Sequence, residues 1–321
     1  MSTPTGYRVQ DPSTDQVVET FPALTDGEVD QLLAAAETAQ RAWAARPIEE
    51  RAAIVQKVTD LFEERKDELA QIIATEMGKR VTEGVEEAEF SSAIFGYFAD
   101  KGPTLAADRP IETYGGGRAM IRHLPLGVLL GVMPWNFPYY QIARFAAPNL
   151  MLGNAIVLKH AEICPRSALA VQQIMDDAGV PAGVYTNVFA THDQIAEFIA
   201  DPRVAGVAFT GSTDTARAIN RAMAARDAAI GVLIAETGGL NAMIVDSTAL
   251  TEQVVQDVLV SAFDSAGQRC SAARVLFVQD DIADKVTHML AGAMAELSVG
   301  DPGLLSTDVG PVIDADALAL A

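Results

Sequence analysis

The sequence predicts an α/β protein, in which a doubly wound parallel sheet is followed by an incomplete second α/β domain. The main observation is a change of rhythm at Val128, after which short apolar runs alternate with segments of helical periodicity. Such βαβ alternation is typical of a parallel sheet covered by helices on both faces. The length supports this prediction, because 321 residues can form two domains that each bury a core.

The region before Val128 is predicted to be mostly helical. The segment up to Pro22 is rich in turns, and a capping box beginning at Thr25 predicts the start of a helix. Apolar residues at helical spacing predict two more helical stretches, at about 48–77 and 81–99. A glycine-rich break and weak alternation then predict a projecting hairpin at about 109–126.

The remaining elements divide the chain into a first domain, residues 1–235, and the first part of a second domain, residues 236–321. In the first domain we expect strands near 128–133, 155–159, 184–189, 205–209 and 231–235, and helices near 139–151, 165–178, 192–200 and 212–225. In the second we expect strands near 242–246 and 274–278, and helices near 251–264 and 281–297. Ligands of such sheets bind at the carboxyl ends of the strands, so function is expected there.

Composition argues against several classes of function. The 23 basic and 43 acidic residues give a formal charge of −20, which opposes binding to nucleic acid. The longest apolar stretch, Leu124 to Met133, is shorter than the roughly 20 residues that span a bilayer, and no signal peptide is recognisable. Two cysteines are too few for a disulfide framework and favour a cytoplasmic location. The four histidines show no metal-ligand spacing, so no metal is expected.

Three residues are candidates for catalysis. Cys270 ends a polar Gly-Gln-Arg-Cys loop and is a candidate nucleophile, although a buried structural cysteine is the commoner fate of this residue. Glu236 follows an apolar run, and a carboxylate at the end of a buried strand suits a general base; a capping or ion-paired glutamate is the alternative. Asn136 could donate to an oxyanion together with the backbone N–H of Cys270, or simply bond its own turn.

Two further segments are candidates for binding a dinucleotide. Gly211, Ser212 and Thr213 lie between a strand and a helix, where backbone N–H groups can bind phosphate, although the spacing is not a G-x-G-x-x-G fingerprint. Lys159 and Glu162 follow another strand and could bond ribose hydroxyls, or form a solvated pair. A carboxylate there would repel a 2′-phosphate, which favours NAD over NADP.

These motifs together resemble the aldehyde dehydrogenase superfamily over essentially the whole chain. The segments PWNFP, KHAE, FTGST, ETGG and GQRC occur in the family's order and spacing. The resemblance implies that Cys270 forms a thiohemiacetal whose oxyanion Asn136 holds, and that Glu236 activates water to hydrolyse the thioester. It also implies a homo-oligomer and the following cofactor-binding residues: Trp135, Lys159, Glu162, and the segment Gly211 to Ala216 with Ser212 and Thr213.

The resemblance to particular subfamilies is split. Up to about residue 205 the chain is similar to succinate-semialdehyde dehydrogenases, and Arg144, eight residues after Asn136, matches their carboxylate-binding arginine; a helix-surface arginine is the alternative. From there on it is similar to the glutamate-semialdehyde (pyrroline-5-carboxylate) dehydrogenase domain of proline-utilisation proteins. Asp264 stands where some succinate-semialdehyde enzymes have a second arginine. The family continues well beyond this length, which implies a C-terminally truncated catalytic domain.

The expected function is therefore NAD-dependent oxidation of a small aldehyde that carries a carboxylate. Arg144 favours succinate semialdehyde, and the surroundings of Cys270 favour L-glutamate γ-semialdehyde as the alternative. A CoA-acylating enzyme is a competing prediction, against which Glu236 argues because no water-activating base would be needed. An inactive fragment that binds nucleotide is the alternative outside enzymes.

Overall fold

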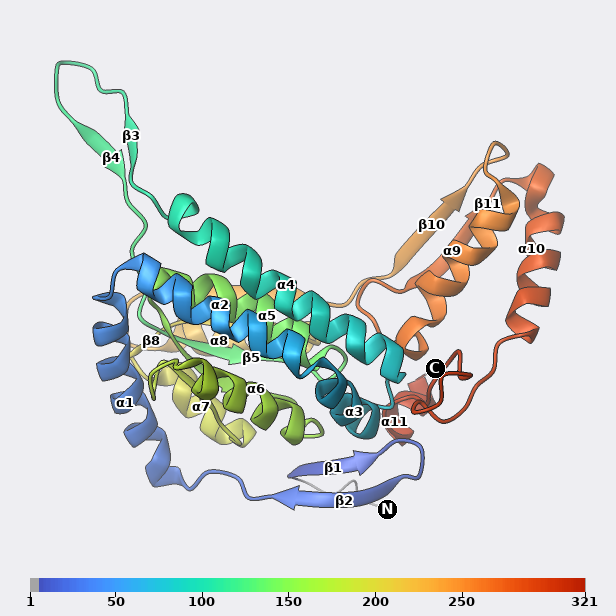
Figure 1. The fold of residues 1–321 in the computed structure, drawn as a ribbon, viewed down its shortest axis with the longest axis horizontal. Helices are drawn as coiled ribbons and strands as arrows, with labels where there is room; N and C mark the ends of the chain where they lie inside the picture. Colours follow the sequence, from blue (N-terminus) through green and yellow to red (C-terminus); the bar gives the residue numbers. More distant parts are fainter. Residues whose placement is uncertain (1–5, 321) are drawn as a thin grey trace.

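The computed structural model describes residues 6–320 and contains a parallel sheet of five strands in the order β7-β6-β5-β8-β9 (Figure 1). The strands are β5 (Val128–Val132), β6 (Ala155–Lys159), β7 (Tyr185–Asn187), β8 (Val204–Gly211) and β9 (Val232–Thr237). From central β5 the chain builds outward through β6 and β7, then crosses to β8 and β9 on the other side. The strand order therefore switches between β5 and β8, where this class of fold binds ligands.

Helices cover both faces of this sheet, which confirms the doubly wound prediction. They are α5 (Pro138–Leu152), α6 (Pro165–Ala178), α7 (His192–Ala200) and α8 (Thr213–Ala225). Successive strand residues point to opposite faces, so Leu129 and Ile156 enter the core beneath α5 and α6. Leu130 and Val157 enter the other core, beneath α7 and α8. Both faces of the strands are thus buried, as continuous apolar runs predict.

The N-terminal region packs around this sheet as a hairpin and four helices. They are β1 (Tyr7–Asp11), β2 (Gln16–Phe21), α1 (Asp26–Ala44), α2 (Ile48–Glu64), α3 (Lys66–Met77) and α4 (Val81–Leu105). The prediction of one helix over 48–77 is wrong, because Arg65 leaves the helical conformation, at φ −103° and ψ 11°, and separates α2 from α3. The predicted capping box forms, since the Glu28 carboxylate accepts the Thr25 backbone N–H at 2.7 Å.

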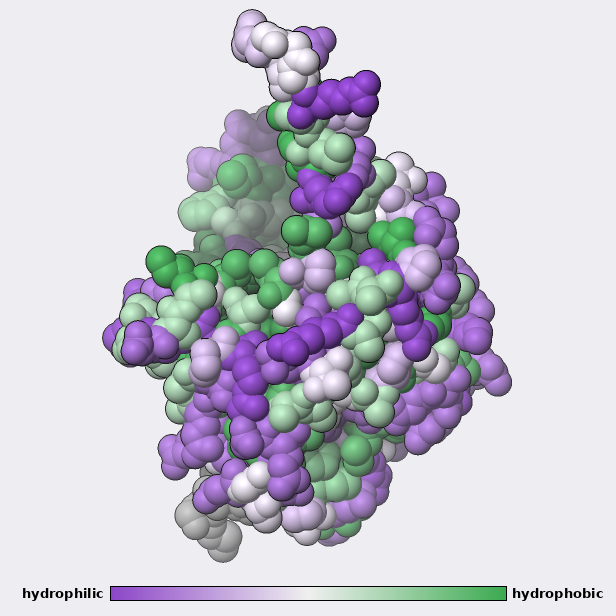
Figure 2. All heavy atoms as spheres, turned by 90° about the vertical axis from the view of Figure 1, so that its left-hand side faces the viewer, coloured by the Kyte–Doolittle hydropathy of each residue, from purple (hydrophilic) through white to green (hydrophobic). Residues whose placement is uncertain are grey.

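The predicted hairpin stands away from the body of the molecule (Figure 1). Its strands β3 (Arg109–Ile111) and β4 (Ala119–Ile121) pair antiparallel. Figure 2 shows the molecule from the left-hand side of Figure 1, where hydrophobic residues gather at the junction of the hairpin and the body. Leu105, Leu124 and Leu126 are among the exposed hydrophobic residues of this region.

The C-terminal region forms a smaller α/β unit beside the sheet. Its elements are β10 (Asn241–Val245), α9 (Thr251–Phe263), a 3₁₀ turn (Asp264–Gly267), β11 (Ala273–Val278), α10 (Asp280–Ala295) and α11 (Ala315–Leu320). Strands β10 and β11 pair in parallel. The five-stranded sheet ends at Thr237, so Glu236 lies on the last strand of the first sheet rather than in the second unit.

A buried carboxylate, Glu76, holds the start of α6. Its oxygens accept the backbone N–H groups of Arg166 at 2.6 Å and Ser167 at 2.9 Å, and the Ser167 hydroxyl at 2.6 Å. Burial outweighs these bonds and raises the pKa of Glu76 from 4.5 to about 7. The folded state therefore binds this proton more tightly than the unfolded state does.

This pKa predicts a pH dependence of stability that Glu76→Gln removes. The contribution of the protonated carboxyl is complete below about pH 4.5 and is lost as the pH rises through about 7. We expect the free energy of unfolding of the wild type, relative to Glu76→Gln, to fall across that interval. Urea denaturation of both proteins at several pH values measures the difference, and a constant difference would contradict the prediction.

Candidate active site

The predicted motifs meet at the carboxyl ends of β5, β8 and β9. Register aligns these ends, because Val132 on β5 pairs with Phe209 on β8, and Thr210 pairs with Glu236 on β9. A cavity of about 730 Å³ opens there, and Asn136, Glu236 and Cys270 all line it. The structure thus brings the three predicted catalytic residues together at the switch point of the sheet.

Cys270 is exposed and follows a backbone segment of unusual conformation. Ser265, Ala266 and Gly267 have φ values of 58°, 53° and 69°. This is the left-handed conformation, which residues other than glycine seldom adopt. The alternative of a buried structural cysteine applies instead to Cys164, which is fully buried and whose thiol pKa is raised by that burial.

The guanidinium of Arg269 is bonded to helix α9. It donates to the carbonyl oxygens of Val260 at 2.5 Å and Ser261 at 2.8 Å, near the end of α9. Carbonyl groups at the C-terminus of a helix lack intrahelical partners, and a cation there satisfies them. Arg269 therefore fastens residues 264–272, which contain the predicted nucleophile Cys270 and are called the nucleophile loop, to helix α9 before them.

Asn136 is bonded to the nucleophile loop and not to its own turn. Its Nδ2 donates to the carbonyl of Gln268 at 2.9 Å, and its Oδ1 is buried without a partner among the described residues. The loop therefore takes one N–H of this amide. A primary amide has two N–H donors, so one remains for a ligand in this cavity.

The prediction that Glu236 ends a buried strand is wrong. Strand β9 is the edge of its sheet, so its outer side lacks a neighbour, and Val232 and Ile234 remain 45% and 58% exposed. Glu236 is itself exposed, and the desolvation expected for it is absent. Its place in the lining of the Cys270 cavity is unaffected, since that follows from its register with Thr210.

A second cavity, of about 830 Å³, continues from the first and gathers the predicted cofactor residues. Trp135, Gly211 and Ser212 line both cavities, and Lys159 and Glu162 line the second. Lys159 is buried, which lowers its pKa, while Glu162 opposes this from 3.5 Å between Nζ and Oε1. A helix start can bind phosphate through its N–H groups, and a lysine and a carboxylate can bond ribose hydroxyls, so binding of a dinucleotide here stays a prediction.

Two of the predicted cofactor residues, Thr213 and Ala216, line neither cavity. Ala216 packs in the core beneath α8, and its N–H already bonds the Ser212 carbonyl at 3.0 Å. Ser212 caps the helix, its Oγ accepting the Thr215 N–H at 3.1 Å. A helix hydrogen bond already uses the Ala216 N–H group, and the part of Ala216 in phosphate binding stays a prediction.

Arg144 lies on α5 away from the nucleophile. Its Nη2 donates to Thr210 Oγ1 at 3.3 Å, and its guanidinium lies 5.8 Å from the centre of the Tyr140 ring. It lines neither cavity that contains Cys270. In this arrangement the guanidinium bridges α5 and β8, and its predicted grip on a substrate carboxylate stays a prediction.

A third cavity, of about 460 Å³, reaches Cys270 from the side of α4 and is rich in charge. The carboxylates in its lining are Glu83, Glu86, Glu87 and Asp264, and the cations are Lys79 and Arg269. Asp264 faces this cavity, where burial, followed by the charge of Glu83, raises its carboxyl pKa. Lys79, Glu83 and Glu87 were not predicted from the sequence. The spacing of four residues between Glu83 and Glu87 was a signal that they share one side of a helix.

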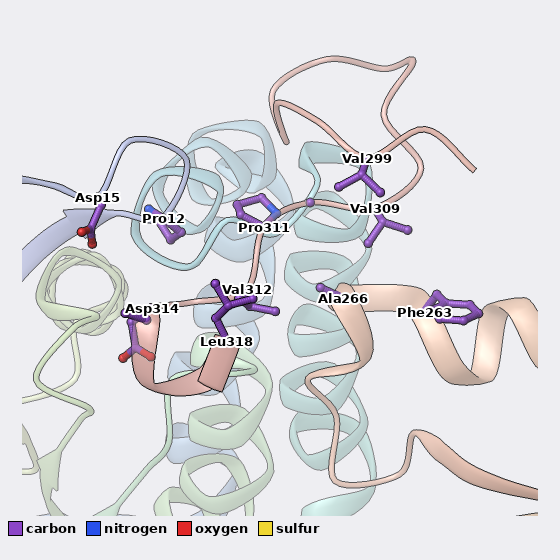
Figure 3. Close-up of a pocket in the computed structure, with 12 residues that line it drawn as sticks. Pro12, Asp15, Phe263, Ala266, Val299, Val309, Pro311, Val312, Asp314 and Leu318 are labelled. Carbon is purple, nitrogen blue, oxygen red and sulfur yellow. The ribbon is translucent and has the colours of Figure 1, made fainter. Parts of the chain in front are cut away.

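An apolar cavity of about 610 Å³ lies behind the nucleophile loop (Figure 3). Phe263 and Ala266 face Val299, Val309 and Pro311 across it. Because Ala266 lines both this cavity and the one containing Cys270, the loop separates an apolar space from the reactive crevice. Within residues 6–320, no cluster of potential metal ligands is found and no helix could cross a bilayer.

Comparisons with known proteins agree with this geometry. The aldehyde dehydrogenase family model matches residues 1–320. The chain is 41% identical over 306 residues to a succinate-semialdehyde dehydrogenase [NADP(+)] of Deinococcus radiodurans, and the match covers 95% of this chain and 63% of that protein. It is 44% identical over 299 residues to the bifunctional protein PutA of Salmonella typhimurium, covering 92% of this chain and 22% of that protein.

A solved structure also resembles this chain closely. The succinic semialdehyde dehydrogenase of Streptococcus pyogenes, in complex with NADP+, superposes with a TM-score of 0.94 at 35% identity, covering 98% of this chain and 68% of that one. The chain thus spans about two thirds of the length of the single-function relatives. By sequence and by structure, this chain belongs to the aldehyde dehydrogenase family.

Proposed function

We propose that this chain oxidises a small aldehyde to the corresponding acid with a nicotinamide cofactor. The observation that supports this most is the single cavity, at the switch point of the sheet, lined by Cys270, Asn136 and Glu236. A thiol, an amide donor and a carboxylate are the groups needed to bind an aldehyde covalently, hold its oxyanion and activate water.

The chemistry assigns one role to each residue. The Cys270 thiolate attacks the carbonyl carbon, a C–S bond forms, and the oxygen becomes an oxyanion that the free N–H of Asn136 can hold. Such a donor contributes about 3–4 kcal/mol to the stability of the transition state. A bound nicotinamide supplies an acceptor for the hydride that leaves when the oxyanion collapses to a thioester. Glu236 then takes a proton from water, which attacks the thioester carbon and releases the acid and the Cys270 thiolate.

Two semialdehydes are candidate substrates, and the charge around Cys270 favours L-glutamate γ-semialdehyde. The α4-side cavity holds four carboxylates against two cations, and Arg80 beside Glu83 and Asp264 adds a third cation. Acidic groups still outnumber basic ones, so an ammonium group on the substrate would offset its carboxylate. Succinate semialdehyde, favoured in the sequence analysis by Arg144, lacks that group, and Arg144 lines no cavity at the nucleophile. One relative is named succinate-semialdehyde dehydrogenase and another is named bifunctional protein PutA, which supports keeping both candidates.

A single-turnover experiment tests the proposed activity. The protein is mixed with cofactor and each semialdehyde in turn, and reduced nicotinamide is followed by absorbance without CoA. A burst near one equivalent with acid as product supports the proposal, and the larger rate constant identifies the better substrate. Cofactor binding without a burst would instead support an inactive nucleotide-binding fragment. A burst only with CoA would indicate an acylating enzyme.

We infer from Glu162 that the chain prefers NAD to NADP. Relatives whose names include NADP weigh against this preference. A carboxylate that accepts from ribose hydroxyls would repel a 2′-phosphate. Glu162→Gln is therefore expected to raise the ratio of NADP to NAD affinity about tenfold or more, with unchanged stability. Calorimetric titration with both cofactors measures the ratio, and an equal ratio in the two proteins would contradict the preference.

A reducing compartment, such as the cytoplasm, is the location that we propose. Both cysteines are free, and an exposed thiol such as that of Cys270 persists most readily where disulfides do not form.

A further inference from the structure

The first two turns of α4 contact both halves of the reactive site. Glu83 and Glu87 are four residues apart and therefore lie on the same side of the helix. Glu83 Oε1 accepts the backbone N–H of Ser265, in the nucleophile loop, at 2.8 Å. Glu87 Oε1 accepts the N–H groups of Tyr139 at 2.8 Å and Tyr140 at 3.2 Å, in the first turn of α5 after the Asn136 turn.

Lys79, just before α4, completes the contact with the Asn136 turn. Its ammonium group pairs with Glu87 where both side chains are 1% exposed, and it donates to the Asn136 carbonyl at 3.0 Å. It also lies 3.5 Å from the centre of the Phe137 ring. A buried, fully bonded ion pair allows little movement of the backbone that it touches. The Asn136 turn is thus fixed relative to α4.

The nucleophile loop needs contacts with other segments to keep its backbone conformation. Ser265 and Ala266 are not glycines, and the left-handed conformation they share is sterically disfavoured, so it persists only where surrounding contacts impose it. The bond from Ser265 N to Glu83 is such a contact at the first residue of the run. Glu83 is itself placed by Arg80, 3.2 Å away, which also approaches Asp264.

From these contacts we propose that Glu83 is a positioning residue, which holds the left-handed nucleophile loop so that Cys270 faces the Asn136 amide. Lys79 and Glu87 fix the other partner to the same helix. This inference rests on the proposed function for its effect on catalysis. The effect on the loop conformation is independent of the proposed function and can be measured separately.

The test compares Glu83→Ala with Glu83→Gln, which keeps an oxygen able to accept the Ser265 N–H. Glu89→Ala is the control, since Glu89 lies on the same helix in an exposed pair with Lys66 and lines no cavity at Cys270. We expect Glu83→Ala to lower the rate constant of the NADH burst about 10- to 100-fold with KM within twofold, Glu83→Gln to recover most of it, and Glu89→Ala to match the wild type. In an Asn136→Ala background, Glu83→Ala should cost little more, because the partner it aligns is gone.

Amide hydrogen exchange of the peptide 264–272 separates this inference from the proposed function. Glu83→Ala should exchange faster there than the wild type, and Glu83→Gln and Glu89→Ala should not. Equal exchange in Glu83→Ala and Glu89→Ala would overturn the positioning role, even if no semialdehyde is oxidised. Faster exchange in Glu83→Ala with an unchanged burst rate constant would also overturn it. So would a Glu83→Ala loss of burst rate that is as large in the Asn136→Ala background as in the wild type.

Discussion

Cys270→Ala is expected to abolish the NADH burst with either semialdehyde while leaving cofactor affinity unchanged. Without the sulfur no thiohemiacetal forms, and covalent nucleophiles removed in this way cost on the order of 10⁶ in rate. Cofactor contacts should survive because Trp135, Lys159 and Glu162 line a cavity that Cys270 does not reach. Rapid-mixing absorbance measures the burst, and calorimetry measures the affinity.

Cys164→Ala is the matched control, because the chain has only these two cysteines. Cys164 is fully buried and its thiol pKa is raised by burial, so it should react neither with aldehyde nor with iodoacetamide. Iodoacetamide should therefore label the wild type and Cys164→Ala once, and Cys270→Ala not at all. A burst that survives in Cys270→Ala would remove the chemical basis of the proposed function.

Glu87→Ala is expected to lower the free energy of unfolding by about 3–5 kcal/mol, the usual cost of breaking a buried ion pair. The substitution leaves the Lys79 ammonium buried without its carboxylate and deprives Tyr139 and Tyr140 of the acceptor for their N–H groups. Urea denaturation measures the loss.

The double variant Lys79→Met/Glu87→Leu distinguishes an unpaired charge from lost packing. Replacing both charges by apolar groups removes the isolated ammonium, so the double variant should be more stable than Glu87→Ala. It should remain less stable than the wild type, since the first turn of α5 still lacks its cap. A double variant as unstable as the sum of its single variants would show that the two charges do not interact.

The sequence predicted the five-stranded sheet well because its strands are continuous apolar runs between clear breaks. Strand β6 and helices α6 and α7 have the predicted bounds. Asn136 follows β5 and Glu236 lies near the end of β9, two strands whose carboxyl ends the topology brings to the switch point. Cys270 lines the same cavity from the loop after α9.

The remaining features depend on contacts between distant segments, which local patterns do not contain. The exposure of Glu236 follows from the edge position of β9, because an apolar strand has the same sequence whether it is central or at an edge. The bond from Asn136 to Gln268 and the hold of Glu83 on Ser265 depend on how two units dock. Arg65 separates α2 from α3, and no proline or glycine stands beside it to mark this break in the sequence.

The hydrogen bond between Asn136 and Gln268 joins residues 132 positions apart in the chain. During synthesis, the first of these residues leaves the ribosome long before the second, and long-range closures of this kind are slow. The residues that line the second cavity all precede Gln268 in the chain, so they leave the ribosome before the loop that contains Cys270 can bond Asn136. If Cys270 acts as proposed, its thiol is aligned with Asn136 only after the C-terminal segments have docked, which limits side reactions of incomplete chains.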